Sequence, residues 1–144
     1  MVMFKTGRYG KVHQGRLSKG SDLFKGLTDF CAGQNIHSGS VAAIGAVISG
    51  AAGFYRQDLL EYKTIEFPRP MEIVSLMGNV SIKDGKPFVH AHIALMDERG
   101  AVFGGHLVEG NVVFACEFTV TEIEGVELRR VYDEETGLFL WPRF

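Results

Sequence analysis

The sequence is poor in several features that define whole classes of protein. It has only two cysteines, Cys31 in a predicted helix and Cys116 in a predicted strand, so both are interpreted as reduced core thiols. No apolar run approaches the roughly 20 residues of a membrane span. The first residues lack the basic, apolar and cleavage regions of a secretory signal. We therefore expect a cytoplasmic protein that has no place in a membrane.

An excess of positive charge is also missing. The 15 lysines and arginines and 17 aspartates and glutamates give a formal net charge of -2. DNA binding draws on basic residues that displace counterions from phosphates, so the overall balance does not favour it. Basic residues nevertheless outnumber acids near the N-terminus, where they share the chain with Asp22 alone: Lys5, Arg8, Lys11, Arg16, Lys19 and Lys25. The simplest interpretation is the solvated faces of early strands, and the alternative is an anion-binding patch.

The composition is that of a globular protein with many turns. Hydrophobic residues make up 46% and charged residues 22% of the 144 residues, and 18 are glycines. This length suffices for one domain with a buried core, so residues 1–144 are expected to form a single domain.

The pattern of apolar residues predicts one helix and seven or more strands. Ser21 is the predicted N-cap of a helix that runs to about Gly33 and buries one apolar face. One or two strands are predicted at residues 2–17, and single strands at 39–48, 52–55, 59–67, 72–82, 87–95, 112–121 and 126–132, with a bend at Gly78. Residues 136–141 close the chain. Short connections favour antiparallel pairing. The fold class is therefore α+β, a mostly antiparallel sheet of about seven strands flanked by one or two helices.

Three histidines carry the strongest chemical signal. His90 and His92 lie two residues apart in a predicted strand, so their side chains share a face. Residues 97–101 are typical of a three-residue hairpin loop with Gly100 in the left-handed conformation. That turn places His92 directly opposite His106, and opposed residues also share a face. A slip of one residue would send His106 to the other side.

Three converging imidazoles predict a metal site. Neutral imidazole nitrogens suit zinc and related transition metals, and three protein ligands leave a fourth position for water or a ligand. The alternative is that His90 and His92 are half-buried strand residues that hydrogen-bond to their neighbours. His13 and His37 have no comparable company and are interpreted as ordinary surface or turn residues.

Five stretches of the chain occur together in a specific order. They are Ala43-Ile44-Gly45-Ala46-Val47, Glu72-Ile73-Val74-Ser75-Leu76-Met77-Gly78-Asn79-Val80-Ser81, Pro87-Phe88-Val89-His90-Ala91-His92, Gly104-Gly105-His106-Leu107 and Thr136-Gly137-Leu138-Phe139-Leu140-Trp141. In this combination, over nearly its whole length, the chain resembles the PPC family (plant and prokaryote conserved domain, formerly a domain of unknown function).

The resemblance implies a compact α+β subunit that assembles as a homotrimer. It also implies a metal ion, usually zinc, on His90, His92 and His106, the same residues that the hairpin argument selects. A small anionic ligand at that metal is a candidate partner. The fold further resembles that of acetolactate decarboxylase, which holds a catalytic zinc with three histidines; fold alone does not decide function.

The first functional hypothesis is a trimeric, metal-containing, DNA-binding or regulatory protein. Family members are described as DNA-binding because plant relatives join this domain to AT-hooks, arms with an Arg-Gly-Arg-Pro-like core. This sequence has no such core. At Arg69-Pro70-Met71-Glu72-Ile73-Val74 it keeps only half of the plant Gly-Arg-Phe-Glu-Ile-Leu motif. Support for DNA binding therefore rests on the N-terminal basic residues, which three copies would multiply.

The alternative is a metal-dependent enzyme that acts on a small carbonyl or carboxylate substrate. Glu72 is the predicted catalytic acid or base and Glu109 the second candidate, although both also fit a surface carboxylate. A third hypothesis is a scaffold in which zinc only rigidifies the sheet. Four apolar residues serve either the core or a trimer interface on this view: Val112, Phe114, Phe139 and Trp141.

Overall fold

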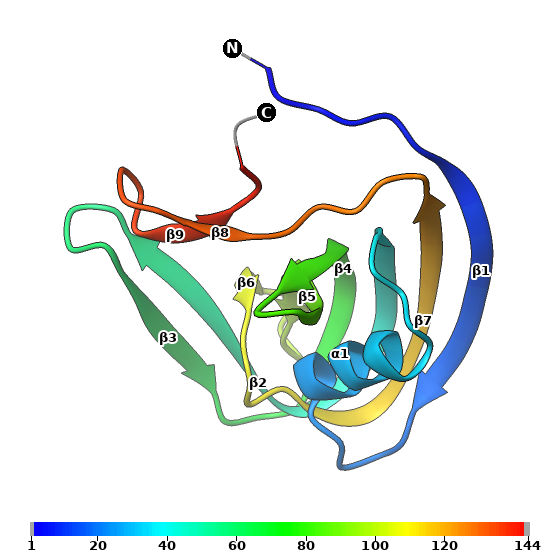
Figure 1. Cartoon of the computed structure of the whole chain (residues 1–144). Helices are drawn as coiled ribbons and strands as arrows, with labels where there is room; N and C mark the ends of the chain where they lie inside the picture. Colours follow the sequence, from blue (N-terminus) through cyan, green and yellow to red (C-terminus); the bar gives the residue numbers. More distant parts are fainter. Residues whose placement is uncertain (1, 143–144) are drawn as a thin grey trace.

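A computed structural model describes residues 2–142 and shows one helix and nine strands within them (Figure 1). In chain order they are β1 (Arg8–Leu17), α1 (Leu23–Gly33), β2 (Gly39–Arg56), β3 (Glu61–Phe67), β4 (Met71–Lys83), β5 (Lys86–Met96), β6 (Val102–Leu107), β7 (Val112–Glu124), β8 (Val131–Asp133) and β9 (Leu138–Leu140). The helix in this part of the chain is too short to cross a membrane. The predicted α+β class is confirmed.

Seven strands form one antiparallel sheet in the order β1-β7-β2-β4-β5-β6, with β3 paired to β2. The first half of β2 lies between β7 and β4, whereas its second half pairs with β3 and with the end of β6. Because β6 also pairs with β5, strands β2, β4, β5 and β6 form a closed circuit of paired strands. The sheet therefore curves strongly, and β8 and β9 form a separate hairpin beside it (Figure 1).

The hydrophobic core lies between α1 and the inner face of this sheet. The buried positions of α1 are Leu23, Leu27 and Cys31. Those of β5 are Val89, Ala91, Ile93 and Leu95. Burying one large apolar side chain stabilises the fold by ~1.5–3 kcal/mol. Since side chains alternate along a strand, the intervening residues of β5, His90 and His92 among them, face the outer side of the sheet.

The N-cap of α1 differs from the prediction. Asp22 caps the helix, because its Oδ1 accepts a hydrogen bond from Lys25 N at 3.0 Å. Its Oδ2 accepts a second bond from Gly110 N at 2.7 Å, which ties the helix to the loop before β7. Ser21 instead donates to the Ser18 carbonyl oxygen at 2.6 Å. The prediction of Ser21 was wrong because Ser and Asp both cap helices, so the local pattern does not separate these two adjacent residues. The further bond to Gly110 favours Asp22.

Several strands differ in extent from their predicted ranges. The first begins at Arg8, and the predicted strands 39–48 and 52–55 are one continuous strand, β2. The predicted hairpin of residues 52–55 with 59–67 is confirmed by the pairing of β2 with β3. The predicted strand 126–132 is reduced to the short β8.

Strand β8 is shorter than predicted because the backbone of the segment before it is bonded to the end of β4. Ile82 N donates to the Leu128 carbonyl oxygen at 2.9 Å, and Arg130 N donates to the Ile82 carbonyl oxygen at 2.7 Å. These two bonds carry the chain back over the sheet. They place Arg130 beside β5.

Strand β4 is regular at Gly78, where a bend was predicted. Its register shifts between Ile73 and Ser75 instead. A Cβ atom at Gly78 would collide with the carbonyl oxygen of His90 and with Ala91. Glycine is therefore present because two backbones approach closely, and it keeps β4 against the strand that carries the histidines.

Candidate metal centre

The hairpin between β5 and β6 sets the position of the histidines. Gly100 has a φ of 80°, and Asp97 N donates to the Ala101 carbonyl oxygen at 3.0 Å. The Asp97 carboxylate also accepts bonds from Arg99 N and Ala101 N, each 3.0 Å long, which holds the turn closed. The resulting register pairs His92 with His106, as predicted.

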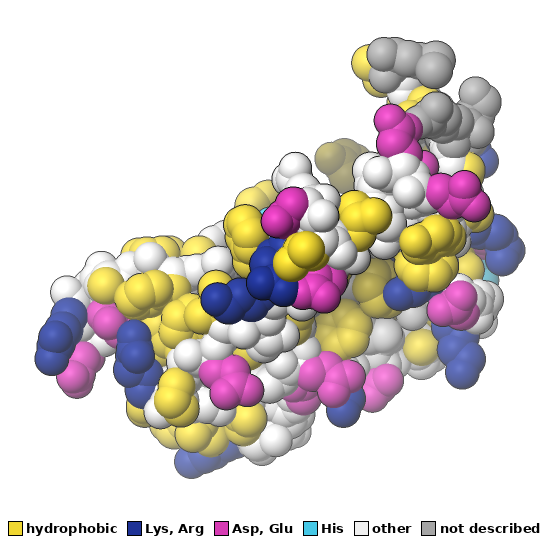
Figure 2. Space-filling view, turned by 90° about the vertical axis from the view of Figure 1, so that its left-hand side faces the viewer, with side chains coloured by type: hydrophobic (Ala, Val, Ile, Leu, Met, Phe, Trp, Pro, Cys, Tyr) yellow, Lys and Arg dark blue, Asp and Glu magenta, His cyan; other side chains and the backbone are white. Residues whose placement is uncertain are grey.

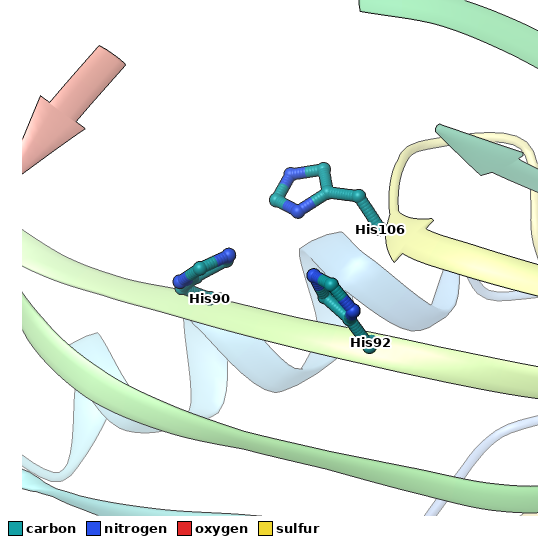
Figure 3. A group of neighbouring side chains, drawn as sticks. All are labelled: His90, His92 and His106. Atoms are coloured by element: carbon teal, nitrogen blue, oxygen red, sulfur yellow. The ribbon is translucent and has the colours of Figure 1, made fainter. Parts of the chain in front are cut away.

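The three imidazoles of His90, His92 and His106 point into one space on the outer face of the sheet (Figure 3). Their ring centroids are 5.7 Å apart for His90 and His92, 5.0 Å for His90 and His106, and 5.8 Å for His92 and His106. One nitrogen from each ring lies within 4.8 Å of the others. The predicted convergence is therefore confirmed.

Two of these histidines are neutral at pH 7. Burial is the largest cause that lowers the pKa of His90 and of His106, in each case to about 4. The positive charge of Arg130 and the neighbouring imidazoles lower the pKa of both further, and Lys83 contributes at His106. A neutral imidazole keeps a lone pair for a metal, so protons do not compete for these nitrogens near neutral pH.

The donor set fits a transition metal. His106 Nδ1 is buried and has no hydrogen-bond partner. An unsatisfied buried polar atom costs ~1–3 kcal/mol, and coordination would remove that cost. Three neutral imidazoles are a ligand set of catalytic zinc sites, which keep one position open. When bound there, the ion would supply Lewis acidity to an oxygen atom in the open position.

The guanidinium of Arg130 lies directly beside the cluster. Its Nη2 donates to His90 Nδ1 at 3.2 Å and to Asn79 Oδ1 at 3.0 Å. Its Nε donates to Ser81 Oγ at 2.9 Å and its Nη1 to the Phe139 carbonyl oxygen at 3.0 Å. Four bonds therefore hold this side chain in place. No sequence pattern marked Arg130, because its position depends on contacts about 40 residues away along the chain.

Arg130 also constrains how His90 can act as a ligand. An arginine only donates, so Nδ1 of a neutral His90 accepts with its lone pair and the hydrogen sits on Nε2. If His90 ligates a metal through Nε2, the hydrogen moves to Nδ1, and if it ligates through Nδ1, the lone pair is used. In both cases the hydrogen bond from Arg130 is lost.

A cavity of about 320 Å³ adjoins His90 and His106. It lies between the β2–β3 turn, the β4–β5 turn and β9. Tyr62 stacks on His106 with ring centroids 4.8 Å apart. Tyr55 donates its hydroxyl to the Thr136 carbonyl oxygen at 2.6 Å and so joins β2 to the turn before β9. The histidines thus border a small-molecule-sized space.

The predicted catalytic residue Glu72 is not close to the histidines. It lies opposite Met96, four residues beyond His92 on β5, which is about 13 Å along a strand. It lines a different cavity, with Glu98 and Arg99. Glu109 pairs with Lys25 at 2.9 Å near the start of α1. A catalytic role for Glu72 stays a prediction.

The basic N-terminal residues are partly neutralised by acids of β7. Arg8 pairs with Glu124 at 2.9 Å. On the side away from β1, which faces the viewer in Figure 2, basic and acidic side chains lie among each other and among hydrophobic ones. His37 pairs with Glu127 at 3.0 Å on the surface, as predicted, whereas His13 is partly buried where it pairs with Glu122 at 2.7 Å and packs against Phe30.

Comparisons with known proteins agree on one family. The model of the Plants and Prokaryotes Conserved (PCC) domain matches residues 4–124. A metal-containing protein from Archaeoglobus fulgidus is 44% identical with a TM-score of 0.92, over 99% of this chain and 100% of that one. A plant- and prokaryote-conserved protein from Pyrococcus horikoshii is 36% identical with a TM-score of 0.92, over 99% of each chain.

Two further relatives are named for other functions. A candidate DNA-binding protein from Bacteroides thetaiotaomicron is 27% identical with a TM-score of 0.84, over 96% of this chain and 98% of that one. The bifunctional protein GlmU of a Synechococcus strain is 29% identical over 128 residues, which are 88% of this chain. The chain spans 20% of the length of that curated relative.

Proposed function

Since this chain belongs to the Plants and Prokaryotes Conserved domain family, we propose that it is a metal-binding protein whose ligands are His90, His92 and His106. The supporting observation is the convergence of three imidazoles on one space, with the buried Nδ1 of His106 left without a partner. Zinc is the preferred ion for this ligand set. The relative from Archaeoglobus fulgidus is named as a metal-containing protein, which agrees with the proposal.

Elemental analysis of untagged protein after zinc dialysis tests the metal site. We expect about one zinc per chain in the wild type and less than a tenth of that in His92→Ala. His37→Ala is the matched control, because His37 pairs with Glu127 on the surface and should leave the zinc content unchanged. A wild type that holds no metal would contradict the proposal.

We further propose that the chain associates with copies of itself through the outer face of the sheet, as a homotrimer by resemblance to the family. This face exposes large apolar side chains on three neighbouring strands: Ile44 is 58%, Met77 69% and Phe114 55% exposed. Phe114 is one of the four apolar residues that the sequence assigned to either the core or an interface. Its exposure supports an interface. Exposed apolar patches of this kind mark association sites.

Sedimentation measures this association directly. The wild type should have three times the chain mass of 15.9 kDa. Ile44→Glu should dissociate it, whereas Leu59→Glu, at an exposed leucine on the β2–β3 turn, should not. A monomeric wild type would contradict self-association.

Association with DNA is the second candidate function. It is favoured by the name of the relative from Bacteroides thetaiotaomicron, and by Lys11 and Arg16, which make no ion pair within residues 2–142. Binding through phosphates predicts a salt-sensitive mobility shift of duplex DNA that weakens in Arg16→Gln. Complete absence of a shift at low salt would remove this candidate.

The enzyme alternative requires turnover that depends on the metal. A three-histidine zinc would polarise a carbonyl oxygen or lower the pKa of bound water to about 7. Acetolactate-type and other 2-oxo acids are the substrates to test, with zinc and after chelation. Activity that a chelator does not change would contradict metal dependence. Full activity in Glu72→Gln would contradict a catalytic role for Glu72.

A further inference from the structure

Two positively charged side chains beside the histidines have no carboxylate partner. Arg130 donates only to neutral acceptors, and no ion pair within residues 2–142 includes it or Lys83. The Lys83 ammonium lies over the rings of Phe88 and Phe139, 5.1 Å and 4.5 Å from their centroids. A half-buried cation without a counter-charge is costly, so the site favours an anion from outside.

The cavity that both cations border is itself positive. Glu61 is the one acidic residue among the described residues that line it, and it already pairs with Arg56. A divalent ion on three neutral imidazoles would add charge of the same sign. The opposite charge has to come from a ligand.

The remaining lining indicates that this ligand is organic. Aromatic and aliphatic side chains form most of the wall, among them Tyr55, Tyr62, Phe88, Leu138 and Leu140. A bare inorganic anion would leave these surfaces without contact. A volume of about 320 Å³ is at the lower end of small-molecule pockets and fits a small ligand.

Arg130 and His90 both line the cavity and contact each other, with 3.2 Å between Nη2 and Nδ1. Because His90 cannot ligate a metal and accept this hydrogen bond at once, a metal-loaded site leaves one Nη2 hydrogen of Arg130 without its partner. The Arg130 side chain lines the cavity. An incoming carboxylate would satisfy it with a charge-assisted hydrogen bond.

We propose that the cavity between β9 and the histidines binds a small organic carboxylate, which Arg130 and Lys83 hold by its charge while a second oxygen of the same ligand takes the open metal position. A 2-hydroxy or 2-oxo acid has this arrangement of oxygens. The proposal rests on the metal site proposed above. It adds to that site the chemical class of the ligand and two residues that select it.

Binding of 2-hydroxyisobutyrate to the zinc-loaded protein, followed by NMR titration, tests the proposal. The wild type should bind it at least roughly tenfold more tightly than its uncharged amide, and more tightly than inorganic phosphate. Arg130→Gln and Lys83→Gln should each weaken binding roughly tenfold. The matched controls are Arg129→Gln and Lys86→Gln, which remove the same charges from neighbouring residues that do not line the cavity, and they should bind as the wild type does.

Zinc content is measured on every sample, so that two failures are distinguished. A wild type with full zinc that does not bind the acid, or binds its amide or phosphate equally well, overturns the carboxylate proposal and leaves the metal site standing. A wild type without zinc overturns the metal site, and this proposal with it. If Arg130→Gln does not fold, as judged by its thermal transition, Lys83→Gln decides, and unchanged affinity in that variant overturns the proposal.

Discussion

At the scale of single residues, His90 and His106 link the chemistry of the site to the stability of the fold. Burial first, and then neighbouring positive charge, lowers the pKa of each from 6.5 to about 4. In the unfolded chain both side chains regain their ordinary pKa. Between about pH 6.5 and pH 4 the unfolded state therefore binds more protons than the folded state.

The metal-free protein should accordingly lose stability as the pH falls through this window. We expect a loss of about 3 kcal/mol for each of the two histidines, which begins near pH 6.5 and is nearly complete at pH 4. Urea denaturation at several pH values measures it. The double variant His90→Gln, His106→Gln should show a flatter profile than His37→Gln, and equal profiles would contradict the prediction.

At the scale of elements, the sequence predicts features that local contacts determine and misses features that contacts distant in sequence determine. The register of His92 against His106 was predictable because one short turn, closed by Asp97 and Gly100, determines it. The position of Arg130 was not, because it depends on bonds to residues far away in the chain. The choice of Asp22 over the adjacent Ser21 was not either, because both residue types cap helices and only the bond to Gly110, distant in sequence, favours Asp22. The single long β2 was also missed, since its second half is defined by its partners β3 and β6.

The cap of α1 makes a prediction at this scale. Asp22→Ala removes the bond to Lys25 N and the bond to Gly110 N, so the free energy of unfolding should fall by about 1–2 kcal/mol. Ser21→Ala should change it by less than about 0.5 kcal/mol. Chemical denaturation of both variants measures the two free energies of unfolding. An equal loss in the two would contradict the assignment of the cap to Asp22 alone.

The close approach of β4 to β5 leads to a second prediction about stability. Gly78→Ala places a methyl group against the His90 carbonyl oxygen, and we expect a loss of about 3 kcal/mol in the free energy of unfolding. Gly33→Ala, at the end of α1 where a Cβ meets nothing within 4 Å, should be neutral or stabilising by up to about 1 kcal/mol. A Gly78→Ala protein of unchanged stability would show that the strands separate freely.

At the scale of the whole molecule, the outer face of the sheet joins the two proposed surfaces. Strand pairing places Ala42, Met77, His92 and His106 in one row across β2, β4, β5 and β6. The apolar face proposed for self-association therefore borders the proposed ligands directly. A second copy that covers Met77 would also exclude water from around His92.

Zinc affinity should then depend on protein concentration. Dilution that separates the copies should weaken zinc binding several-fold, and Ile44→Glu should show the weaker affinity at every concentration. Competition with a fluorescent zinc chelator across a dilution series measures this. Equal affinity at all concentrations would mean that the two surfaces act independently.

The row across the sheet has a reciprocal consequence. If association tightens the hold on the ion, the ion must tighten association by the same factor, because both describe one free-energy difference. The oligomer would then respond to the amount of zinc available in its surroundings. The single row of residues that joins the two surfaces would thus make the assembly of this protein depend on the supply of metal.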